Sequence, residues 1–321
     1  MSVAIGILIY PGAQMSAVLG LTDLFRLAER FVSEKISDGP SLRVCHLRAE
    51  GISWPKVVFD SYSQAFEKVD MRCDVLILPP SLEPPIVTEA AKPLAAWLRE
   101  CHGEGTILAS VCGGAFLLGE TGLLDGRVVT THWTYAQQLR ERFPKSKIDI
   151  DRLMIDGGDI ISAGGLMSWI DLGLKLVGRF LGPVAMADTA HMMLVDPPGR
   201  EQRYYSGFLP CLTHGDAPIL RAQHFLQAKE GKEVRLSVLA DQAGLEERTF
   251  LRRFQKATGL TATDYAQRLR VAKAQELLQF GQLAIERVGW EVGYSDTGAF
   301  RKVFQRVVGL SPGEYRRRFH V

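Results

Sequence analysis

The sequence predicts two domains: an N-terminal α/β domain with a doubly wound, mostly parallel sheet, and an all-α C-terminal domain. Short apolar runs alternate with helical patterns over residues 3–195, whereas only helical patterns follow Pro218. A break at Asp196-Pro-Pro-Gly199 separates the two patterns. The 321 residues are 46% hydrophobic, which is enough for two hydrophobic cores.

The N-terminal domain is expected over residues 1–195. Alternating strands and helices over this length favour a flavodoxin-like arrangement, in which helices cover both faces of the sheet. The predicted strands are Val3–Tyr10, Leu42–Leu47, Val75–Leu78, Ile107–Val111 and Val128–Thr131. The predicted helices are Ser16–Phe31, Pro85–Glu100, Gly113–Glu120, Tyr135–Phe143 and Met167–Leu181.

Residues 196–217 are expected to link the two domains, because prolines and glycines interrupt the helical pattern at both ends. This linker is either flexible or docked on a neighbouring surface. Its apolar residues favour docking, since they gain by leaving water. They are Tyr204, Tyr205, Phe208 and Leu209.

A pattern in the C-terminal domain, residues 218–321, occurs twice at a nearly fixed offset. Phe250, Phe254, Gly259, Leu260 and Tyr265 recur 50 residues later as Phe300, Phe304, Gly309, Leu310 and Tyr315. Ala240 and Gly244 recur 49 residues later as Gly289 and Gly293. The pattern indicates that one structural unit was built twice. Each copy predicts a helix, a tight turn at Gly244 or Gly293, and a second helix.

The two copies predict helix-turn-helix units at about 236–257 and 285–308, whose second helices fit the major groove of DNA. Polar residues on these second helices face away from the phenylalanines. They are Arg248, Arg252 and Arg253 in the first copy and Thr297, Arg301 and Lys302 in the second. A helical bundle with a solvated basic face is the alternative, and two copies with matched turn glycines argue against it.

The near-neutral total charge hides a basic C-terminal domain. Residues 218–321 contain 18 lysines and arginines against 11 acids, a net charge of +7. Because the whole chain has a net charge of +2, residues 1–217 carry −5. Concentrated positive charge is typical of a phosphate-binding surface, so double-stranded DNA is the expected partner. Arg316, Arg317 and Arg318 are candidates for contacts with the DNA backbone.

Residues 219–320 resemble the AraC/XylS family of bacterial transcription regulators. The resemblance lies in Gly293-Tyr-Ser-Asp-Thr-Gly-Ala-Phe-Arg-Lys-Val-Phe304 and Gly309-Leu-Ser-Pro-Gly-Glu-Tyr-Arg316. It implies a long helix between the units, here about Thr263 to Gln279, and favours activation through RNA polymerase. The base-reading residues that it implies are Arg248, Leu251 and Arg252, then Thr297, Arg301 and Lys302. Arginine suits guanine, whereas leucine contacts only a thymine methyl.

A strand-to-helix turn at Ser110-Val-Cys112-Gly-Gly114 has the sequence of a nucleophile elbow. Small residues beside Cys112 permit the strained backbone of such a turn. A cysteine at a helix N-terminus is expected to have a lowered pKa, and nearby backbone N–H groups bind an oxyanion or carboxylate. The alternative is a small hydrophobic cysteine at the end of a strand.

Residues 3–195 resemble the class I glutamine-amidotransferase-like domain of the PfpI type, in the version fused to AraC-type domains. The resemblance lies in Leu117–Gly126, Thr130-Thr-His-Trp133, and Ser162-Ala-Gly-Gly165 with Asp171. In such regulators it implies a pocket for a small-molecule effector. The ligand-binding residues expected from it are Tyr10, Cys112, Gly113, Gly114, His132 and Trp133.

The cysteine lacks the partners of a catalytic set. His191 precedes two methionines instead of supplying a His-x-Glu, and Gly113 stands where protease-like relatives have histidine. The loop Pro11–Gly20 contains no acid, which leaves His132 as the potential partner. We therefore expect a degenerate elbow and no enzyme. A cysteine-dependent hydrolase or a redox sensor centred on Cys112, fused to a DNA-binding domain, is the alternative.

Composition bears on membrane insertion, cellular compartment and cofactors. No stretch reaches the ~18–20 apolar residues that a membrane helix needs. Five cysteines, without a CxxC or a His/Cys cluster, indicate a reducing cytoplasm and neither a metal nor another cofactor. We expect a cytoplasmic homodimer that is joined through its N-terminal domains.

Overall fold

A computed structural model describes residues 2–35, 39–49, 55–62, 72–232 and 234–321. The chain divides into two compact units, Met1–Gln202 and Arg203–Val321. The division falls inside the segment 196–217 that the sequence predicts as a linker. Residues up to Gln202 therefore pack with the first unit, and those from Arg203 onward with the second. No helix in the described part of the chain is both long and apolar enough to cross a membrane.

The first unit is built on a seven-stranded sheet with the order β3-β2-β1-β4-β5-β9-β8. Its strands are β1 (Ser2–Ile9), β2 (Ser41–Arg48), β3 (Lys56–Asp60), β4 (Val75–Leu78), β5 (Ile107–Val111), β8 (Met154–Asp156) and β9 (Ile160–Ala163). The five inner strands pair in parallel, and the two edge strands pair antiparallel. The prediction of a doubly wound, mostly parallel sheet is confirmed.

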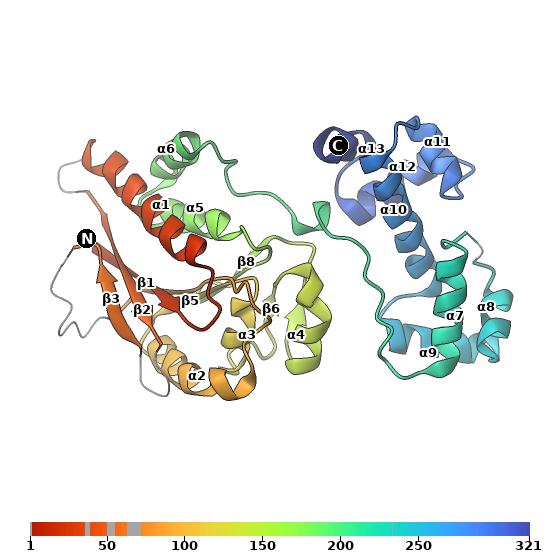
Figure 1. The fold of residues 1–321 in the computed structure, drawn as a ribbon, viewed down its shortest axis with the longest axis horizontal. Coiled ribbons are helices and arrows are strands. Elements are labelled where there is room, and N and C mark those ends of the chain that lie inside the picture. The colour runs from red at the N-terminus through yellow and green to blue at the C-terminus, as the bar shows by residue number, and fades with distance from the viewer. Residues whose placement is uncertain (1, 36–38, 50–54, 63–71, 233) are drawn as a thin grey trace. The chain divides into compact units, whose positions relative to one another are not determined.

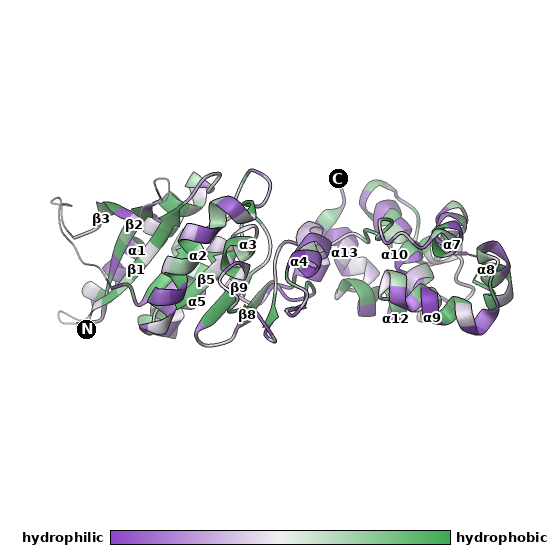
Figure 2. Ribbon diagram, turned by 90° about the horizontal axis from the view of Figure 1, so that it is seen from below, coloured by the Kyte–Doolittle hydropathy of each residue, from purple (hydrophilic) through white to green (hydrophobic). Residues whose placement is uncertain are grey.

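Helices cover both faces of this sheet (Figure 1). One face carries α1 (Met15–Ser33), α5 (Trp169–Phe180) and α6 (Pro183–Met193); the other carries α2 (Thr88–Gly103), α3 (Gly114–Gly119) and α4 (Ala136–Arg142). Each face has its own buried cluster, with Ile5 and Phe25 in one and Leu76 and Phe116 in the other. Figure 2 shows the strands as predominantly hydrophobic, as expected for a sheet buried on both sides.

Some elements differ from the sequence-based prediction. The predicted strand Val128–Thr131 is shortened to β6 (Val128–Val129), which pairs with β7 (Lys147–Ile148) in a separate two-stranded sheet. Thr130 and Thr131 leave the strand because their side chains bond elsewhere, to carbonyl oxygens that include that of Cys112. The strands β3, β7, β8 and β9 and the helix α6 were not predicted. The helix α6 is apolar on most sides, which weakens its periodic signal.

The second unit consists of helices (Figure 1). They are α7 (Ala217–Ala228), α8 (Leu236–Ala243), α9 (Glu247–Thr258), α10 (Ala262–Phe280), α11 (Ile285–Glu291), α12 (Thr297–Val308) and α13 (Pro312–Phe319). The pair α8 and α9 forms one helix-turn-helix, and α11 and α12 form the other. The helix α10 joins them, so the all-α prediction with two such units is confirmed.

The duplicated sequence pattern corresponds to duplicated packing. Phe254 and Phe304 are fully buried, and Tyr265 and Tyr315 lie edge-on to them with ring centroids 5.4 and 5.6 Å apart. The turn glycines Gly244 and Gly293 both adopt left-handed backbone, with φ of 66° and 86°, which a side chain would strain. The five-residue pattern therefore specifies the same core twice.

Residues 203–211 dock along the second unit. The Arg318 guanidinium donates a hydrogen bond to the Tyr205 hydroxyl at 2.7 Å, and Gln275 donates to the Ser206 carbonyl at 3.3 Å. Phe208 then packs edge-on against Tyr265, with ring centroids 5.0 Å apart. The sequence leaves open whether the linker is flexible or docked, and in the structure this part of it is docked.

Candidate functional sites

Cys112 occupies a strained turn between β5 and α3. Its φ is 53°, a left-handed value that side chains rarely adopt. The end of the neighbouring strand β4 comes so close that a Cβ on Gly114 would lie 2.4 Å from the carbonyl oxygen of Leu78. Gly114 must therefore be glycine, and the backbone has the form of an elbow.

The Cys112 thiol is buried and protonated at neutral pH. Only 2% of the residue is exposed, and burial raises the pKa of the thiol to about 11 against a smaller opposing effect of the Gly113 N–H. The expected lowering of this pKa is therefore wrong, because the loss of hydration outweighs the dipole of a six-residue helix. Within the described ranges, the thiol has no hydrogen bond to a histidine or carboxylate.

His132 lies on the loop next to the elbow, and one nitrogen of its ring is bonded locally. Its Nδ1 lies 2.7 Å from the Thr134 hydroxyl and accepts the Thr134 N–H at 3.2 Å. The ring stacks on Trp133 with centroids 5.7 Å apart, and burial lowers the pKa of the imidazole. The connection to the elbow is made by Thr131, whose hydroxyl donates to the carbonyl oxygen of Cys112 at 2.7 Å.

The second helix of each helix-turn-helix exposes the side opposite its phenylalanines. Arg248, Leu251 and Arg252 are exposed on α9, as are Arg301 and Lys302 on α12, while Thr297 is half-buried at the start of α12. Leu251 is 44% exposed, which is unusual for leucine and consistent with a contact surface. Arg301 donates to Glu286 at 2.8 Å, an exposed pair that is weak in water.

Two family models match the chain. The model of the DJ-1/PfpI family matches residues 56–179, and that of a helix-turn-helix domain matches residues 239–318. The chain is a transcription regulator that joins a DJ-1/PfpI domain to an AraC-type helix-turn-helix domain. The two matches fall in different units, in the order that the sequence predicts.

Known proteins similar to this regulator include three other transcription regulators. The HTH-type transcriptional regulator GlxA of Rhizobium meliloti is 28% identical over 224 residues, which cover 69% of this chain and 68% of GlxA. The HTH-type transcriptional regulator CdhR of Pseudomonas aeruginosa is 25% identical over 317 residues, which cover 96% and 90%. A solved AraC family transcriptional regulator from Pseudomonas putida is 18% identical, covers 60% of this chain and 99% of its own, and has a TM-score of 0.44.

Tyr10, one of the expected ligand-binding residues of the regulator, is buried near the Cys112 thiol. It is 3% exposed, and its hydroxyl donates to the carbonyl oxygen of Pro79 at 2.6 Å. Burial raises the pKa of this hydroxyl, so it remains a donor. Its role is to hold the segment after β4, where Ser81 lies 3.6 Å from the place of a Cβ on Gly113.

Two residues near the elbow and one in its core cluster were not found from the sequence. Tyr135 lies edge-on to Phe116 at 5.9 Å, and burial and the nearby Cys112 thiol raise the pKa of its hydroxyl. Gln14 is 4% exposed, and its backbone N–H donates to Pro80. Trp169 shares the core cluster of Cys112. Within the described residues, Gln14 Oε1 and Trp169 Nε1 have no hydrogen-bond partner.

Gln202, the last residue of the first unit, is a fourth such residue. It is 2% exposed, and its Oε1 accepts the backbone N–H of Trp133 at 3.0 Å. Its Nε2 donates to the carbonyl oxygens of Thr131 and Ile150, each at 3.0 Å. The end of the first unit is thus fixed to the loop that carries His132. A glutamine in a predicted linker carries no sequence signal for this role.

Two of the expected DNA-contacting arginines have partners within the second unit. Arg253 forms a two-pronged ion pair with Asp216, the N-cap of α7, at 2.7 and 2.9 Å. Arg316 donates to the carbonyl oxygen of Leu283 at 2.6 Å and is half-buried. Both guanidinium groups hold elements of the second unit together. Of the three consecutive arginines, Arg317 keeps its place as an exposed candidate for a backbone contact.

A metal site is not apparent among the residues that the structure describes. No group of three or more histidine, cysteine, aspartate or glutamate side chains is arranged to hold an ion there.

Proposed function

We propose that this regulator binds two neighbouring DNA boxes through α9 and α12, and that a small molecule bound in its DJ-1/PfpI domain controls this binding. The duplication carries the proposal. Each of the two helices buries a phenylalanine pair and exposes the opposite side, with Arg248 and Arg252 on α9 and Lys302 on α12. Exposed basic residues on such a helix suit base edges and phosphates in a major groove.

The helix α10 supports a fixed spacing between the boxes. It has 19 residues and therefore spans ~28 Å between the two helix-turn-helix units. Both units pack on it, through Tyr265 in the first and Val271 and Leu278 in the second. Two recognition helices held on one such rod fit boxes about one helical turn apart, ~10 bp.

The ligand site of the proposal lies beside the Cys112 elbow. Gln14 Oε1 is a buried acceptor and Trp169 Nε1 a buried donor, and neither has a partner within the described residues. Buried polar atoms without partners are costly unless something pairs with them. A small polar molecule bound beside either atom would satisfy it.

The same site supports binding better than catalysis. A nucleophilic cysteine needs a thiolate and a base, whereas the Cys112 thiol has a pKa raised to about 11 and His132 is held by Thr134. We therefore assign the elbow a structural and ligand-binding role. Cys112, Gly113, Gly114, His132 and Trp133 remain the proposed lining, with Gln14, Tyr135 and Trp169 added.

Gln202 provides the route from ligand to DNA. Its side chain holds the backbone of Thr131 and Trp133 in the first unit. The next residue, Arg203, begins the segment that docks on the second unit through Tyr205 and Phe208. A ligand that binds one position of the loop more tightly than another would thereby bias the docked segment. Such a difference in affinity between two states is what control by a ligand requires.

Selection of randomised DNA duplexes by the purified full-length protein tests the DNA-binding part. We expect enrichment of a motif with two boxes about one turn apart. Absence of any enriched motif, in a folded protein at ~100 mM salt where specific contacts persist, would contradict it. Repeating the selection with metabolite pools then reveals the effector as a change in the amount of bound DNA.

The proposal includes a dimer formed through the DJ-1/PfpI domains. It also includes activation by contact with RNA polymerase, which the AraC/XylS resemblance implies. Sedimentation of the full-length protein tests the first part, and transcription in vitro from a promoter that carries the selected motif tests the second. A monomer, or a lowered transcript level, would contradict the corresponding part.

A further inference from the structure

The first residue of α9 is an acid where the second copy has a threonine. At the offset of 50, Glu247 corresponds to Thr297, and each is the first residue of its helix. The correspondence extends to the core, since Phe250 and Phe300, three residues further on, are both fully buried. Thr297 is one of the expected base-reading residues. Internal symmetry therefore assigns Glu247 to the DNA-facing side of α9, next to Arg248.

The helix itself does not use the Glu247 carboxylate. In α12 the N-cap Asp296 accepts hydrogen bonds from the backbone N–H groups of Gly298 and Ala299, at 2.9 and 3.0 Å. In α9 the corresponding N-cap, Glu246, makes no such bond. Glu247 is exposed, and among the residues placed by the structure its carboxylate has no hydrogen bond or ion pair. It is available to an external donor.

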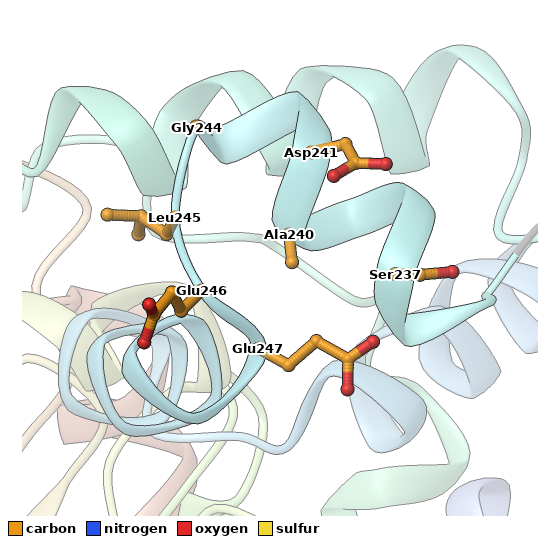
Figure 3. A pocket seen from close by; sticks show the side chains of 7 residues that line it. All are labelled: Ser237, Ala240, Asp241, Gly244, Leu245, Glu246 and Glu247. Atoms are coloured by element: carbon orange, nitrogen blue, oxygen red, sulfur yellow. The ribbon is translucent and has the colours of Figure 1, made fainter.

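An acidic hollow surrounds the start of α9. It is open to solvent, has a volume of about 460 Å³, and is lined by Ser237, Ala240, Asp241, Gly244, Leu245, Glu246 and Glu247 (Figure 3). Figure 3 shows Glu246 and Glu247 pointing to opposite sides of the start of the helix, with Asp241 on α8. Three carboxylates repel phosphate, so this end of α9 tolerates DNA only where a base edge offers it a donor.

Base chemistry then selects the partner of Glu247. In the major groove guanine presents only acceptors to it, and thymine an acceptor and a methyl group. Adenine presents an amino donor beside an acceptor, whereas cytosine presents an amino donor alone. We infer that Glu247 reads a cytosine in the box bound by α9, by accepting a hydrogen bond from its exocyclic amino group. This inference rests on the proposed DNA-binding function.

The test compares duplex selection by the full-length wild type with selection by Glu247→Ala and Glu247→Gln. The wild type should enrich a cytosine at one position of one box. Glu247→Ala should reduce that preference about tenfold and leave the other positions intact. Glu247→Gln should move the preference to adenine, because an amide donates to adenine N7 and accepts from its amino group.

Two matched variants separate base reading from general charge. Asp241→Asn removes a negative charge from the same hollow but not from α9, and should leave the motif unchanged. Thr297→Ala, at the equivalent position of α12, should alter only the other box. The inference is overturned if Glu247→Ala selects the wild-type motif at every position, or if Asp241→Asn relaxes the same position equally. A wild type that enriches no motif would instead remove the proposed function, and the inference with it.

Discussion

The hydroxyl of Thr131 donates a hydrogen bond of 2.7 Å to the carbonyl oxygen of Cys112. This bond ties the loop that carries His132 to the strained turn of the elbow. Gln202 holds the same loop from its other side, through the carbonyl oxygen of Thr131 and the N–H of Trp133. The elbow, the loop and the end of the first unit therefore form one connected network of buried hydrogen bonds, in which a change at one member reaches the others.

Gln202→Ala should destabilise the first unit by about 2 kcal/mol, because it leaves a buried carbonyl of Thr131 and half-buried backbone groups of Trp133 and Ile150 without their partner. Urea unfolding followed by tryptophan fluorescence measures this loss. Gln138→Ala, which alters an exposed glutamine of α4, serves as the control and should change the unfolding free energy little. Equal stabilities of the two variants would mean that the Gln202 network contributes nothing.

Cys112 should react slowly with iodoacetamide at neutral pH in the folded protein. Burial raises the pKa of its thiol to about 11, so the reactive thiolate grows as pH rises toward that value and is scarce below it. Mass spectrometry of the peptide that contains Cys112, alkylated at several pH values, gives the profile. Peroxide should likewise leave DNA binding unchanged in both wild type and Cys112→Ser. Rapid alkylation at pH 7, or a peroxide effect lost in Cys112→Ser, would revive the hydrolase or redox-sensor alternative.

His46 should make the first unit sensitive to mild acid. It is 5% exposed, bonds the Thr22 hydroxyl at 2.7 Å and stacks on Phe59, and burial lowers its pKa to about 4. Because the folded pKa lies below the unfolded value of about 6.5, the unfolded state binds the proton more tightly. Above pH 6.5, neutral His46 therefore makes its full contribution to the unfolding free energy. As pH falls from 6.5 toward 4, the unfolding free energy drops by roughly 3 kcal/mol. Unfolding free energies measured from pH 7 to 4 in wild type and His46→Gln test this, and parallel curves would contradict it.

Neighbouring arginines on α9 should have different roles. Arg252→Ala should cost ~1–3 kcal/mol in DNA binding and relax one base pair of the motif, because an exposed arginine on this face reads a base. Arg253→Ala should instead lower the melting temperature of the second unit and leave base preference intact, because its guanidinium is bound by Asp216. Selection and calorimetry on both variants separate the two roles. An exchange of these outcomes would show that the assignment of the two arginines is reversed.

The sequence predicts well the features whose cause is local. The phenylalanine pairs, turn glycines and the trailing Tyr265 and Tyr315 are set by helical spacing, so the two units and α10 are found within a few residues of their bounds. Strands such as β4 and β5 are also found, because each is a continuous apolar run that is visible in the local sequence. The edge strands β3 and β8, the inner strand β9 and the helix α6 are missed because tertiary packing, and not periodicity, selects them.

The site is predicted less well because its chemistry depends on contacts that are distant in the chain. Burial raises the pKa of Cys112, whereas its place at a helix N-terminus predicts a lowered pKa. The Tyr10 hydroxyl bonds Pro79, 69 residues further along the chain, and Gln202 bonds Trp133 across 69 residues. Arg253 is indistinguishable from Arg252 in the sequence until Asp216 is brought beside it.

The most direct test of two-box recognition is the affinity of the full-length protein for its selected duplex with five base pairs inserted between the boxes. The insertion turns the second box to the opposite face of the DNA, whereas α10 keeps the two recognition helices at a fixed spacing. We predict a loss of roughly 100-fold, because only one unit at a time can then engage. Unchanged affinity would contradict the claim that α9 and α12 of one chain read neighbouring boxes together.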